Sequence, residues 1–266
     1  MLEISGIPRS TYYYYLKESK KEDKYKDIKE LIVDIFNENY KSYGYRRILL
    51  SLKAKGIVIN HKTVLKLMKE LGIKGKVKAE KYCSYKGEQG ESAENIINRD
   101  FSADKPYEKL TTDVTQFNVC GEKIYLSPVL DMCTTEVLSY NISKSPNFEQ
   151  TRQMLRGLFE VLPEDARPIL HSDRGWQYRM SGYCEMLKEH NITKSMSRKG
   201  NCLDNGIMES FFGRLKVEMF YGETFKSADE FISRLEEYLH YYNNKRISEK
   251  TKGLTPVEFR NQSLIS

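Results

Sequence analysis

The chain has 266 residues, 39% of them hydrophobic and 30% charged, which is enough for one large folded domain or two modest ones. It contains no apolar run near the ~20 residues that a membrane-spanning helix needs, and its first residues lack the basic and then apolar pattern of a signal peptide. Five scattered cysteines without a Cys-x-x-Cys pair argue against a disulfide scaffold or a structural zinc site. We therefore expect a protein of the reducing cytoplasm with no membrane partner.

The net charge of +6 is unevenly distributed. Residues 39–81 hold twelve Lys or Arg and only two Glu, so the rest of the chain is slightly acidic. A concentrated basic segment is the electrostatic signature of a partner with a phosphate backbone. A solvated lysine-rich surface is the alternative, but the asymmetry favours a nucleic acid.

Three amphipathic helices are predicted in the N-terminal part. Apolar residues recur at helical spacing in residues 22–39, 46–55 and 61–71. Asn60 is expected to cap the third helix, and Gly56 and Gly72 to end the second and the third.

Short helices joined by tight turns in a basic segment are typical of helix-turn-helix-like DNA-binding modules. We predict such a module over residues 1–74 and take Arg46 and Arg47 as candidate DNA contacts. A helical bundle used only for packing or subunit contact is the alternative.

The composition and the hydrophobic pattern of the sequence change twice after this module. Residues 75–104 are rich in Lys, Gly, Ser, Glu and Asn and hold no period, which indicates a linker or an extended arm. Beyond the linker, strands are expected at residues 111–119, 123–132, 137–143, 168–171 and 192–196. Helices are expected at residues 147–161, with a cap at 145–146, and at 177–190, 204–220 and 227–242. A three-stranded meander with a first turn at 120–122, followed by alternating helix and strand, predicts an α/β domain over residues 105–262, with a mixed five-stranded sheet and helices on its faces.

Three acidic residues have a telling local context. Asp113 lies in a β-type run, Asp173 follows a short predicted strand, and Glu209 lies in a helical stretch. A sheet with a helix beside it could bring the three carboxylates to one point, where they would repel each other unless a cation neutralised them. Hard oxygen ligands suit Mg²⁺ or Mn²⁺, and two such ions can clamp the attacking and leaving oxygens at phosphorus. Taken singly, Asp113 would be better explained as a sheet-edge aspartate and Glu209 as part of a solvated helix face.

Basic residues close to these acids are candidate phosphate contacts. Lys216 lies seven residues after Glu209, so two helical turns place both side chains on one face. An ordinary surface lysine is the alternative. Weaker candidates for contact with the DNA backbone are Arg174, Arg198 and Lys199.

Other residues near the acids have structural interpretations. Trp176 is expected to pack beneath the turn that follows Asp173, rather than to stack on a base. Asp204 is expected to cap the helix that carries Glu209, with a metal-ligand role as the alternative. Asp131 is expected to be structural. His171 is expected to pack against the backbone, or else to orient Asp173.

Four short motifs, in order, resemble the integrase catalytic core. They are residues 112–115 (Thr-Asp-Val-Thr), 125–131 (Tyr-Leu-Ser-Pro-Val-Leu-Asp), 171–175 (His-Ser-Asp-Arg-Gly) and 205–212 (Asn-Gly-Ile-Met-Glu-Ser-Phe-Phe). The match is to the transposase subunit that the second reading frame of frameshifting bacterial insertion sequences encodes. The resemblance extends over nearly the whole chain, through residues 43–47 and 61–64 of the helix-turn-helix-like region and residues 241–246 and 255–256 near the carboxyl end.

The resemblance implies a ribonuclease-H-like fold with Asp113, Asp173 and Glu209 as the catalytic and metal-binding triad for two Mg²⁺ or Mn²⁺ ions. It implies hydrolysis at the element's end, followed by attack of the freed 3′-hydroxyl on a second phosphodiester, without ATP or a covalent protein intermediate. The implied partners are the terminal inverted repeats, target DNA, the upstream reading-frame subunit and further copies of this chain. The implied location is the bacterial cytoplasm, at the nucleoid.

Two other functions are compatible with parts of the sequence. Tyr241 and Tyr242 are adjacent, and paired tyrosines serve as covalent nucleophiles in other transposases, although the four histidines are too dispersed in sequence for the metal site that such enzymes use. A DNA-binding regulator or a decayed transposase would need no active site, and the intact acidic triad argues against that alternative.

Overall fold

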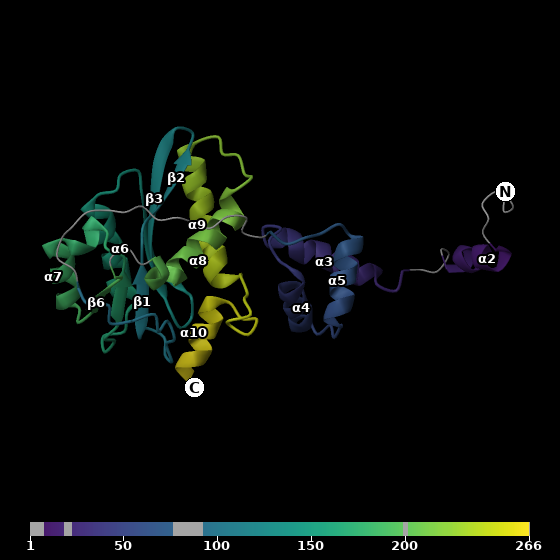
Figure 1. Ribbon diagram of the computed structural model, residues 1–266, viewed down its shortest axis with the longest axis horizontal. Coiled ribbons are helices and arrows are strands. Elements are labelled where there is room, and N and C mark those ends of the chain that lie inside the picture. Colours follow the sequence, from purple (N-terminus) through teal and green to yellow (C-terminus); the bar gives the residue numbers. More distant parts are fainter. Residues whose placement is uncertain (1–7, 19–22, 77–92, 199–201, 266) are drawn as a thin grey trace. The chain divides into compact units, whose positions relative to one another are not determined.

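The computed structural model describes residues 8–18, 23–76, 93–198 and 202–265. The chain divides into two compact units, residues 1–75 and residues 76–266. Each unit is drawn in Figure 1 and is described by itself. In the described ranges no helix is both long and apolar enough to cross a bilayer.

The N-terminal unit is built from helices alone in its described part. These are α2 (Arg9–Glu18), α3 (Lys26–Glu38), α4 (Tyr45–Ala54) and α5 (His61–Glu70). Its core consists of fully buried aliphatic side chains from α3, α4 and α5, among them Ile32, Ile48, Leu52 and Val64. The last three helices match the predicted ones to within a few residues, whereas α2 was not predicted.

The predicted ends of these helices are confirmed. The side chain of Asn60 accepts a hydrogen bond from the backbone N–H of Lys62 at 2.8 Å and so caps α5. Gly56 and Gly72 follow α4 and α5 with φ values of 81° and 67°, in the left-handed region that favours glycine at a helix C-terminus.

The second unit is organised around one mixed sheet. Its strands are β1 (Lys109–Thr112), β2 (Thr115–Val119), β3 (Glu122–Asp131), β4 (Val137–Ser143), β5 (Ile169–Ser172) and β6 (Thr193–Met196). β1 and β2 both pair with β3 in one continuous register, with Thr112 opposite Val129 and Thr115 opposite Leu126. They are therefore two halves of a single strand, and the predicted strand over 111–119 is interrupted at Asp113 and Val114.

With β1 and β2 counted as one strand, the sheet has the five strands that the sequence predicts. Their order is β4, β3, the β1–β2 strand, β5 and β6. β3 runs antiparallel to both of its neighbours, whereas β1, β5 and β6 are parallel. The predicted first turn is a two-residue hairpin in which Cys120 and Gly121 both have positive φ, as a type I′ turn requires.

Helices cover both faces of this sheet (Figure 1). They are α6 (Phe148–Val161), η1 (Trp176–Arg179), α7 (Ser181–Glu189), η2 (Cys202–Asn205), α8 (Gly206–Leu215), η3 (Lys216–Phe220), α9 (Ala228–Asn244) and α10 (Pro256–Ile265). The buried core between α6, α7 and the sheet includes Leu110, Leu155, Leu170 and Tyr178.

Three predicted helices differ from the observed ones in detail. The helix predicted over 177–190 is split, because Met180 is extended between η1 and α7. The helix predicted over 204–220 contains a 3₁₀ turn before α8 and a π-helical turn after it. α6 is capped by the side chain of Asn147, which accepts from the N–H of Gln150, and not by the two residues before it. α10 was not predicted.

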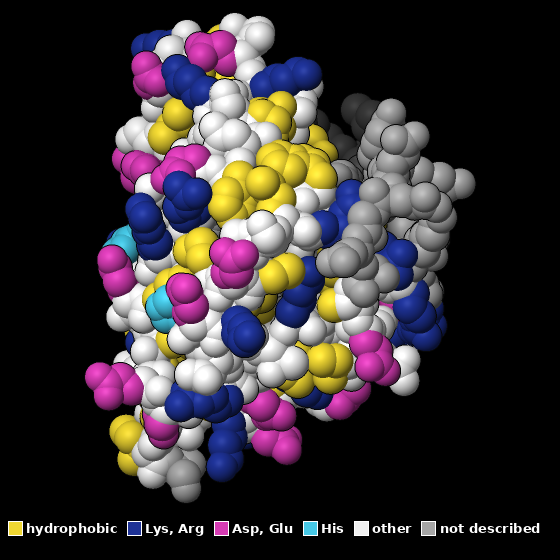
Figure 2. All heavy atoms as spheres, turned by 90° about the vertical axis from the view of Figure 1, so that its left-hand side faces the viewer, with side chains coloured by type: hydrophobic (Ala, Val, Ile, Leu, Met, Phe, Trp, Pro, Cys, Tyr) yellow, Lys and Arg dark blue, Asp and Glu magenta, His cyan; other side chains and the backbone are white. Residues whose placement is uncertain are grey.

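The face of the molecule shown in Figure 2 carries interspersed acidic and basic side chains, with hydrophobic side chains gathered between them. Neither sign of charge dominates this face. The feature that positions the functional residues is instead the interruption in the central strand.

Candidate active site

Asp113 and Asp173 leave the sheet side by side. β1 and β5 are parallel neighbours whose last residues, Thr112 and Ser172, are register partners. The residue that follows each of them is an aspartate, so both carboxylates lie at the same edge of the sheet. We refer to Asp113 and Asp173 together as the acidic edge.

Local backbone groups hold each carboxylate of the acidic edge. Oδ1 of Asp113 accepts a hydrogen bond from the N–H of Val114 at 2.7 Å. Oδ1 of Asp173 accepts from the N–H of Gly175 at 2.8 Å. These short loops fix where the carboxylates point, but their neutral N–H groups only partly offset the negative charge.

Glu209 lies on α8, and its negative charge acts on Asp113. It lies in the first turn of this helix, which contacts β1. Asn205, immediately before the helix, donates from Nδ2 to Oδ2 of Asp113 at 2.8 Å, and its Oδ1 accepts from the Thr111 hydroxyl at 3.4 Å. Asn205 therefore links the start of α8 directly to the acidic edge, a role that the sequence did not reveal.

The carboxylates of this site disfavour one another's ionisation. Burial raises the pKa of Asp113 well above its usual range, and the charges of Asp173 and Glu209 raise it further, against hydrogen bonds from Val114 and Asn205. Burial also raises the pKa of Asp173, which Gly175 and the charge of Arg179 oppose. The site thus concentrates negative charge in a poorly solvated place, where a cation would be stabilised.

The donor chemistry of the site fits a hard divalent cation, because all three side chains offer carboxylate oxygens. Within the described ranges, however, no three His, Cys, Asp or Glu side chains are already arranged as a metal site. Asp113 and Asp173 share the edge, while Glu209 acts on Asp113 electrostatically.

Two basic residues act on the acidic edge. Lys216, the first residue of η3, is half-buried; burial lowers its pKa and the charge of Asp113 raises it. Its Nζ also lies 5.3 Å from the ring centroid of Phe117. Lys216 and Glu209 therefore both interact electrostatically with Asp113. Arg179, which the sequence interpretation did not single out, lies on η1 and lowers the pKa of Asp173.

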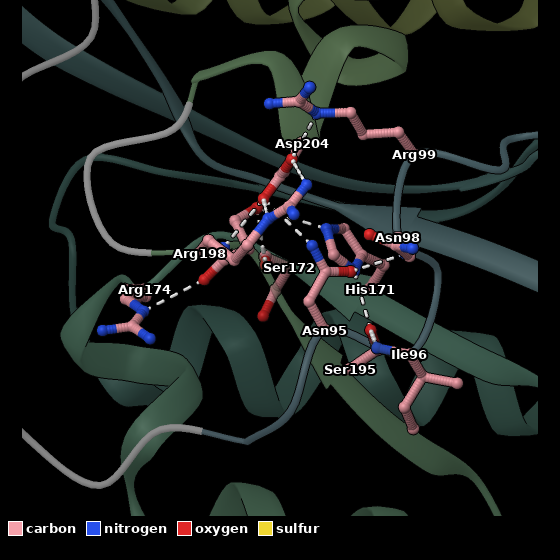
Figure 3. Close-up of polar contacts among 11 residues, drawn as sticks. Asn95, Ile96, Asn98, Arg99, His171, Ser172, Arg174, Ser195, Arg198 and Asp204 are labelled. Atoms are coloured by element: carbon pink, nitrogen blue, oxygen red, sulfur yellow. Dashed lines mark hydrogen bonds and ion pairs between the residues drawn. The ribbon is translucent and has the colours of Figure 1, made fainter.

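The other predicted DNA contacts differ in the interactions that their side chains make within the protein. Nε of Arg174 donates to the carbonyl of Ser197 at 3.0 Å, and Figure 3 shows its guanidinium directed away from the neighbouring cluster around Asp204. The guanidinium of Arg198 is paired with Asp204, so its position is set by the protein. Lys199 lies outside the described residues.

The two arginines of α4 also differ. Arg46 is exposed, with Nε 3.1 Å from the hydroxyl of Tyr45. Arg47 packs its guanidinium 4.4 Å from the ring centroid of Tyr43 and donates to the carbonyl of Ser42. Arg46 is thus presented to solvent, and Arg47 contributes to the packing of the helical unit.

Two of the structural expectations are wrong. Asp204 does not cap α8, because the residue before this helix is Asn205 and the Asp204 carboxylate is bound by arginines instead. Trp176 does not pack beneath the Asp173 turn: its side chain is 48% exposed, and Tyr178 from the same turn fills the core in its place.

Two other structural expectations are met. Asp131 is buried and accepts from the N–H groups of Tyr107 and Thr134 at 2.6 and 2.8 Å, which is a structural role. His171 is buried with its ring nitrogens 2.9 and 3.2 Å from the hydroxyls of Ser195 and Ser197. It packs inside the sheet and does not orient Asp173.

The adjacent tyrosines belong to the core. Tyr241 and Tyr242 are only 6% and 2% exposed. Asn243 exchanges two hydrogen bonds with the backbone of Val137. Arg246 makes a bidentate pair with the buried Glu218. This burial argues against a tyrosine nucleophile and explains the motif at the carboxyl end by packing.

Comparison with known proteins identifies two kinds of domain in this chain. Models of the integrase core domain match residues 103–202 and 209–264, and a model of an HTH-like domain matches residues 22–81. The putative transposase InsK for insertion sequence element IS150 of Escherichia coli is 51% identical over 263 residues, which cover 99% of this chain and 93% of the relative. An uncharacterised transposase-like protein of Haemophilus influenzae is 52% identical over 208 residues, covering 78% and 96%.

A solved structure, the catalytic core domain of HTLV-2 integrase in complex with magnesium, is similar over 59% of this chain and 97% of that one, with 16% identity and a TM-score of 0.47. The integrase core models and the InsK relative decide the family. The chain belongs to the integrase-core transposases of bacterial insertion sequences, which are polynucleotidyl transferases.

Proposed function

We propose that this transposase cuts and joins DNA at Asp113, Asp173 and Glu209, with Mg²⁺ or Mn²⁺ held by these carboxylates. The observation that carries the proposal is the acidic edge, where two aspartates emerge from paired parallel strands and each has a raised pKa. Asp113 and Asp173 accept hydrogen bonds from the neutral groups of Val114, Gly175 and Asn205. Such a site is suited to a cation from solution.

The metal would supply Lewis-acid stabilisation of the negative charge that develops on the phosphoryl oxygens, and we expect two ions because both the attacking and the leaving oxygen need it. The protein holds Asp113 through Asn205 and Val114, so that its carboxylate faces the site. α8 carries Glu209, whose charge acts on Asp113. Lys216, whose charge interacts with that of Asp113, would bind a phosphate of the DNA backbone next to the reacting bond.

The reaction that we propose has two transfers at phosphorus. Water attacks the phosphodiester at the element's end, and the broken bond leaves a 3′-hydroxyl. That hydroxyl then attacks a phosphodiester of target DNA, joining the element to it and releasing another 3′-hydroxyl. One ester bond is exchanged for another in the second transfer, so neither ATP nor a covalent protein intermediate is required.

We propose that Trp176 is a DNA contact of this site. Its indole is 48% exposed, three residues from Asp173 and on the η1 turn that also carries Arg179. A base stacked on an exposed aromatic ring gains about 1–3 kcal/mol. Because Trp176 is the only tryptophan in the chain, its fluorescence should be quenched when DNA with an unpaired end is added. Unchanged emission at saturating DNA would exclude the contact.

The helical unit would bind DNA away from the reacting bond. Arg46 is its exposed candidate, while Arg174 is the candidate beside the acidic edge. We retain Arg47, Arg198 and Lys199 as weaker candidates, since Arg47 and Arg198 are already engaged with Tyr43 and Asp204. Loss of a phosphate contact should weaken binding to all DNA sequences alike and reduce its dependence on salt.

The chain would work with partners at the bacterial nucleoid. We propose that it joins the upstream reading-frame subunit, which supplies the main recognition of the terminal inverted repeats, and that at least two copies assemble on DNA because two ends must be held together. Co-expression of that subunit should be necessary for transposition. Full transposition by this chain alone would contradict this part of the proposal.

Metal-dependent nicking of DNA that carries the terminal repeats tests the catalytic assignment. Asp113→Asn, Asp173→Asn and Glu209→Gln should each abolish nicking and strand transfer while DNA binding persists. If any of these variants transfers strands at the wild-type rate, the assignment is wrong. If the wild type fails to nick even with the upstream subunit and Mn²⁺, a non-catalytic DNA-binding protein is the better interpretation.

A further inference from the structure

Asp204 is the buried centre of a polar cluster beside the acidic edge. Its side chain has no exposed surface, yet it is charged, and five hydrogen bonds converge on its carboxylate. The donors are Nδ2 of Asn95 at 2.9 Å, Nε of Arg99 at 3.0 Å, and the backbone N, Nε and Nη2 of Arg198 at 2.9, 3.0 and 2.9 Å. Figure 3 shows these side chains directed at Asp204 from separate segments of the chain. We call these four residues the latch.

Two of the four latch residues come from a distant part of the sequence. Asn95 and Arg99 lie in residues 93–99, which precede the sheet and are called the arm here. The arm is also held against β6, because the N–H of Met196 donates to the carbonyl of Glu94 at 3.2 Å and the N–H of Ile96 donates to the Ser195 hydroxyl at 3.1 Å. The arm is therefore docked on the catalytic unit at several points.

Within the latch, two arginines compensate the single negative charge of Asp204. The hydrogen bond from Arg198 is the main reason why the pKa of Asp204 lies well below its usual range, and Arg99 acts in the same direction against the effect of burial. Asp204 is consequently ionised at neutral pH. A buried carboxylate with all its acceptor positions engaged is costly to disturb, because a removed donor leaves charge uncompensated.

The latch lies directly before the catalytic helix. Asp204 is followed by Asn205, whose amide holds Asp113, and α8 begins at the next residue. Glu209 lies one turn farther on. A shift of Asp204 would thus move the amide that orients one candidate ligand and the helix that carries another.

We propose that the latch positions the active site, so that docking of the arm fixes the start of α8 and thereby the places of Asn205 and Glu209. This inference rests on the catalytic assignment made above and adds a dependence of that site on residues 93–99. Asp204, Arg99 and Asn95 are positioning residues in this account. They act through Asn205 and α8, and they touch neither the DNA nor a metal.

The chain offers a matched pair of arginines for the test. Arg99 and Arg152 each form one ion pair with an acidic residue, and their side chains are 44% and 43% exposed. The partner of Arg152 is Glu149 on the exposed surface of α6, away from the latch. Arg99→Ala should slow single-turnover strand transfer by about 10-fold or more, as loss of a residue that orients a ligand does, with little change in the DNA concentration for half-maximal rate. Arg152→Ala should keep the wild-type rate.

Three further measurements separate positioning from a loss of folding. Arg99→Lys should recover part of the rate. Amide hydrogen exchange should increase in residues 205–212 in Arg99→Ala and stay unchanged in α6. Asn95→Ala should show a smaller effect of the same kind, and Arg99→Ala should add little to the slowing that Asp204→Asn causes, because both break the same contact.

The outcomes distinguish the latch from the catalytic assignment. The latch is contradicted if Arg99→Ala transfers strands as fast as Arg152→Ala, or if its slower rate is accounted for by the fraction of unfolded protein. Asp113→Asn is measured alongside as the reference. If Asp113→Asn is inactive and Arg99→Ala is fully active, only the positioning role of the latch is contradicted. If Asp113→Asn is active, the catalytic assignment itself is contradicted.

Discussion

Asp113 and Asp204 are both linked to Asn205: Asp204 precedes it in the sequence, and Asp113 accepts a hydrogen bond from its side chain. The two aspartates differ in the charges around them. The carboxylate of Asp204 accepts hydrogen bonds from two arginines and from a side-chain amide, and its pKa is lowered. The carboxylate of Asp113 accepts hydrogen bonds from one side-chain amide and one backbone N–H. The negative charges of two further carboxylates act on it, and its pKa is raised. Both carboxylates lie in poorly solvated places, so burial alone does not separate them.

The difference between these two aspartates lies in where their compensating charge comes from. The cations of the latch are part of the chain, and they tie the arm to the loop before α8. The acidic edge has Lys216 and Arg179 within electrostatic reach, yet its aspartates still have raised pKa values. A carboxylate whose negative charge is not balanced by cations of the chain can bind a cation from solution. A carboxylate whose charge is balanced within the fold has a structural role.

The largest effect is expected at the acidic edge. Asp113→Asn and Asp173→Asn should abolish strand transfer and should leave the unfolding temperature unchanged or raised, because each removes a charge that its neighbours repel. Activity assays and thermal unfolding of the same preparations check this. A variant that loses activity and also loses much of its stability would place these aspartates with the structural ones.

A purely structural acid should give the reverse result. Glu218 and Arg246 form a bidentate pair with both side chains at most 5% exposed, and the Tyr238 hydroxyl donates to the same carboxylate. Arg246→Ala leaves that carboxylate uncompensated and should lower the free energy of unfolding by about 3–5 kcal/mol. The double variant Glu218→Leu with Arg246→Met should recover much of this loss. Equal destabilisation in the single and double variants would show that the charge is not the cause.

Asp204→Asn should fall between these two cases. It should slow strand transfer and also lower the unfolding temperature, by less than Arg246→Ala, because the two arginines of the latch are nearly half exposed to water. Chemical denaturation measures the second effect. A change in activity with no change in stability would mean that Asp204 acts at the acidic edge directly.

The smallest effect is a pH dependence at Glu136, where burial outweighs a single arginine. Burial raises the pKa of Glu136 to about 7 although Arg260 is 2.9 Å away and opposes the shift. The folded state therefore holds this proton more tightly than the unfolded state, in which the pKa is near 4.5. The stabilisation is complete below the unfolded pKa and is lost as the pH rises through about 7.

The Glu136→Gln variant lacks this titration and is the control. The unfolding temperature of the wild type relative to the variant should fall between pH 5 and pH 8. A constant difference over this range would mean that the ion pair with Arg260 keeps Glu136 charged throughout.

The acidic edge could be predicted from sequence because its parts are local. Asp113 and Asp173 each follow a short β-prone run, Glu209 lies in a helical pattern, and the ordered motifs identified the fold that brings strand ends together. The five-stranded sheet and the cap at Asn60 follow from the same short-range patterns, and they are observed.

The latch could not be predicted in this way. Arg99 is 105 residues from Asp204 and lies in a segment without any periodicity, so no local pattern connects the two. The sequence predicts Asp204 as a helix cap because capping depends only on the next few residues, whereas in the structure two arginines bind its carboxylate. The sequence predicts Trp176 beneath the turn that follows Asp173, but Tyr178 occupies the core at this turn and Trp176 is exposed.

Binding of Mn²⁺ to the 266-residue chain tests the distinction between the two aspartates most directly, since it does not depend on DNA or on the upstream subunit. The electron paramagnetic resonance signal of free Mn²⁺ should decrease on addition of the wild type and of Arg152→Ala. Addition of Asp113→Asn should leave the signal nearly unchanged, because the acidic edge has lost a carboxylate. Equal binding of Mn²⁺ by Asp113→Asn and by the wild type would contradict the account.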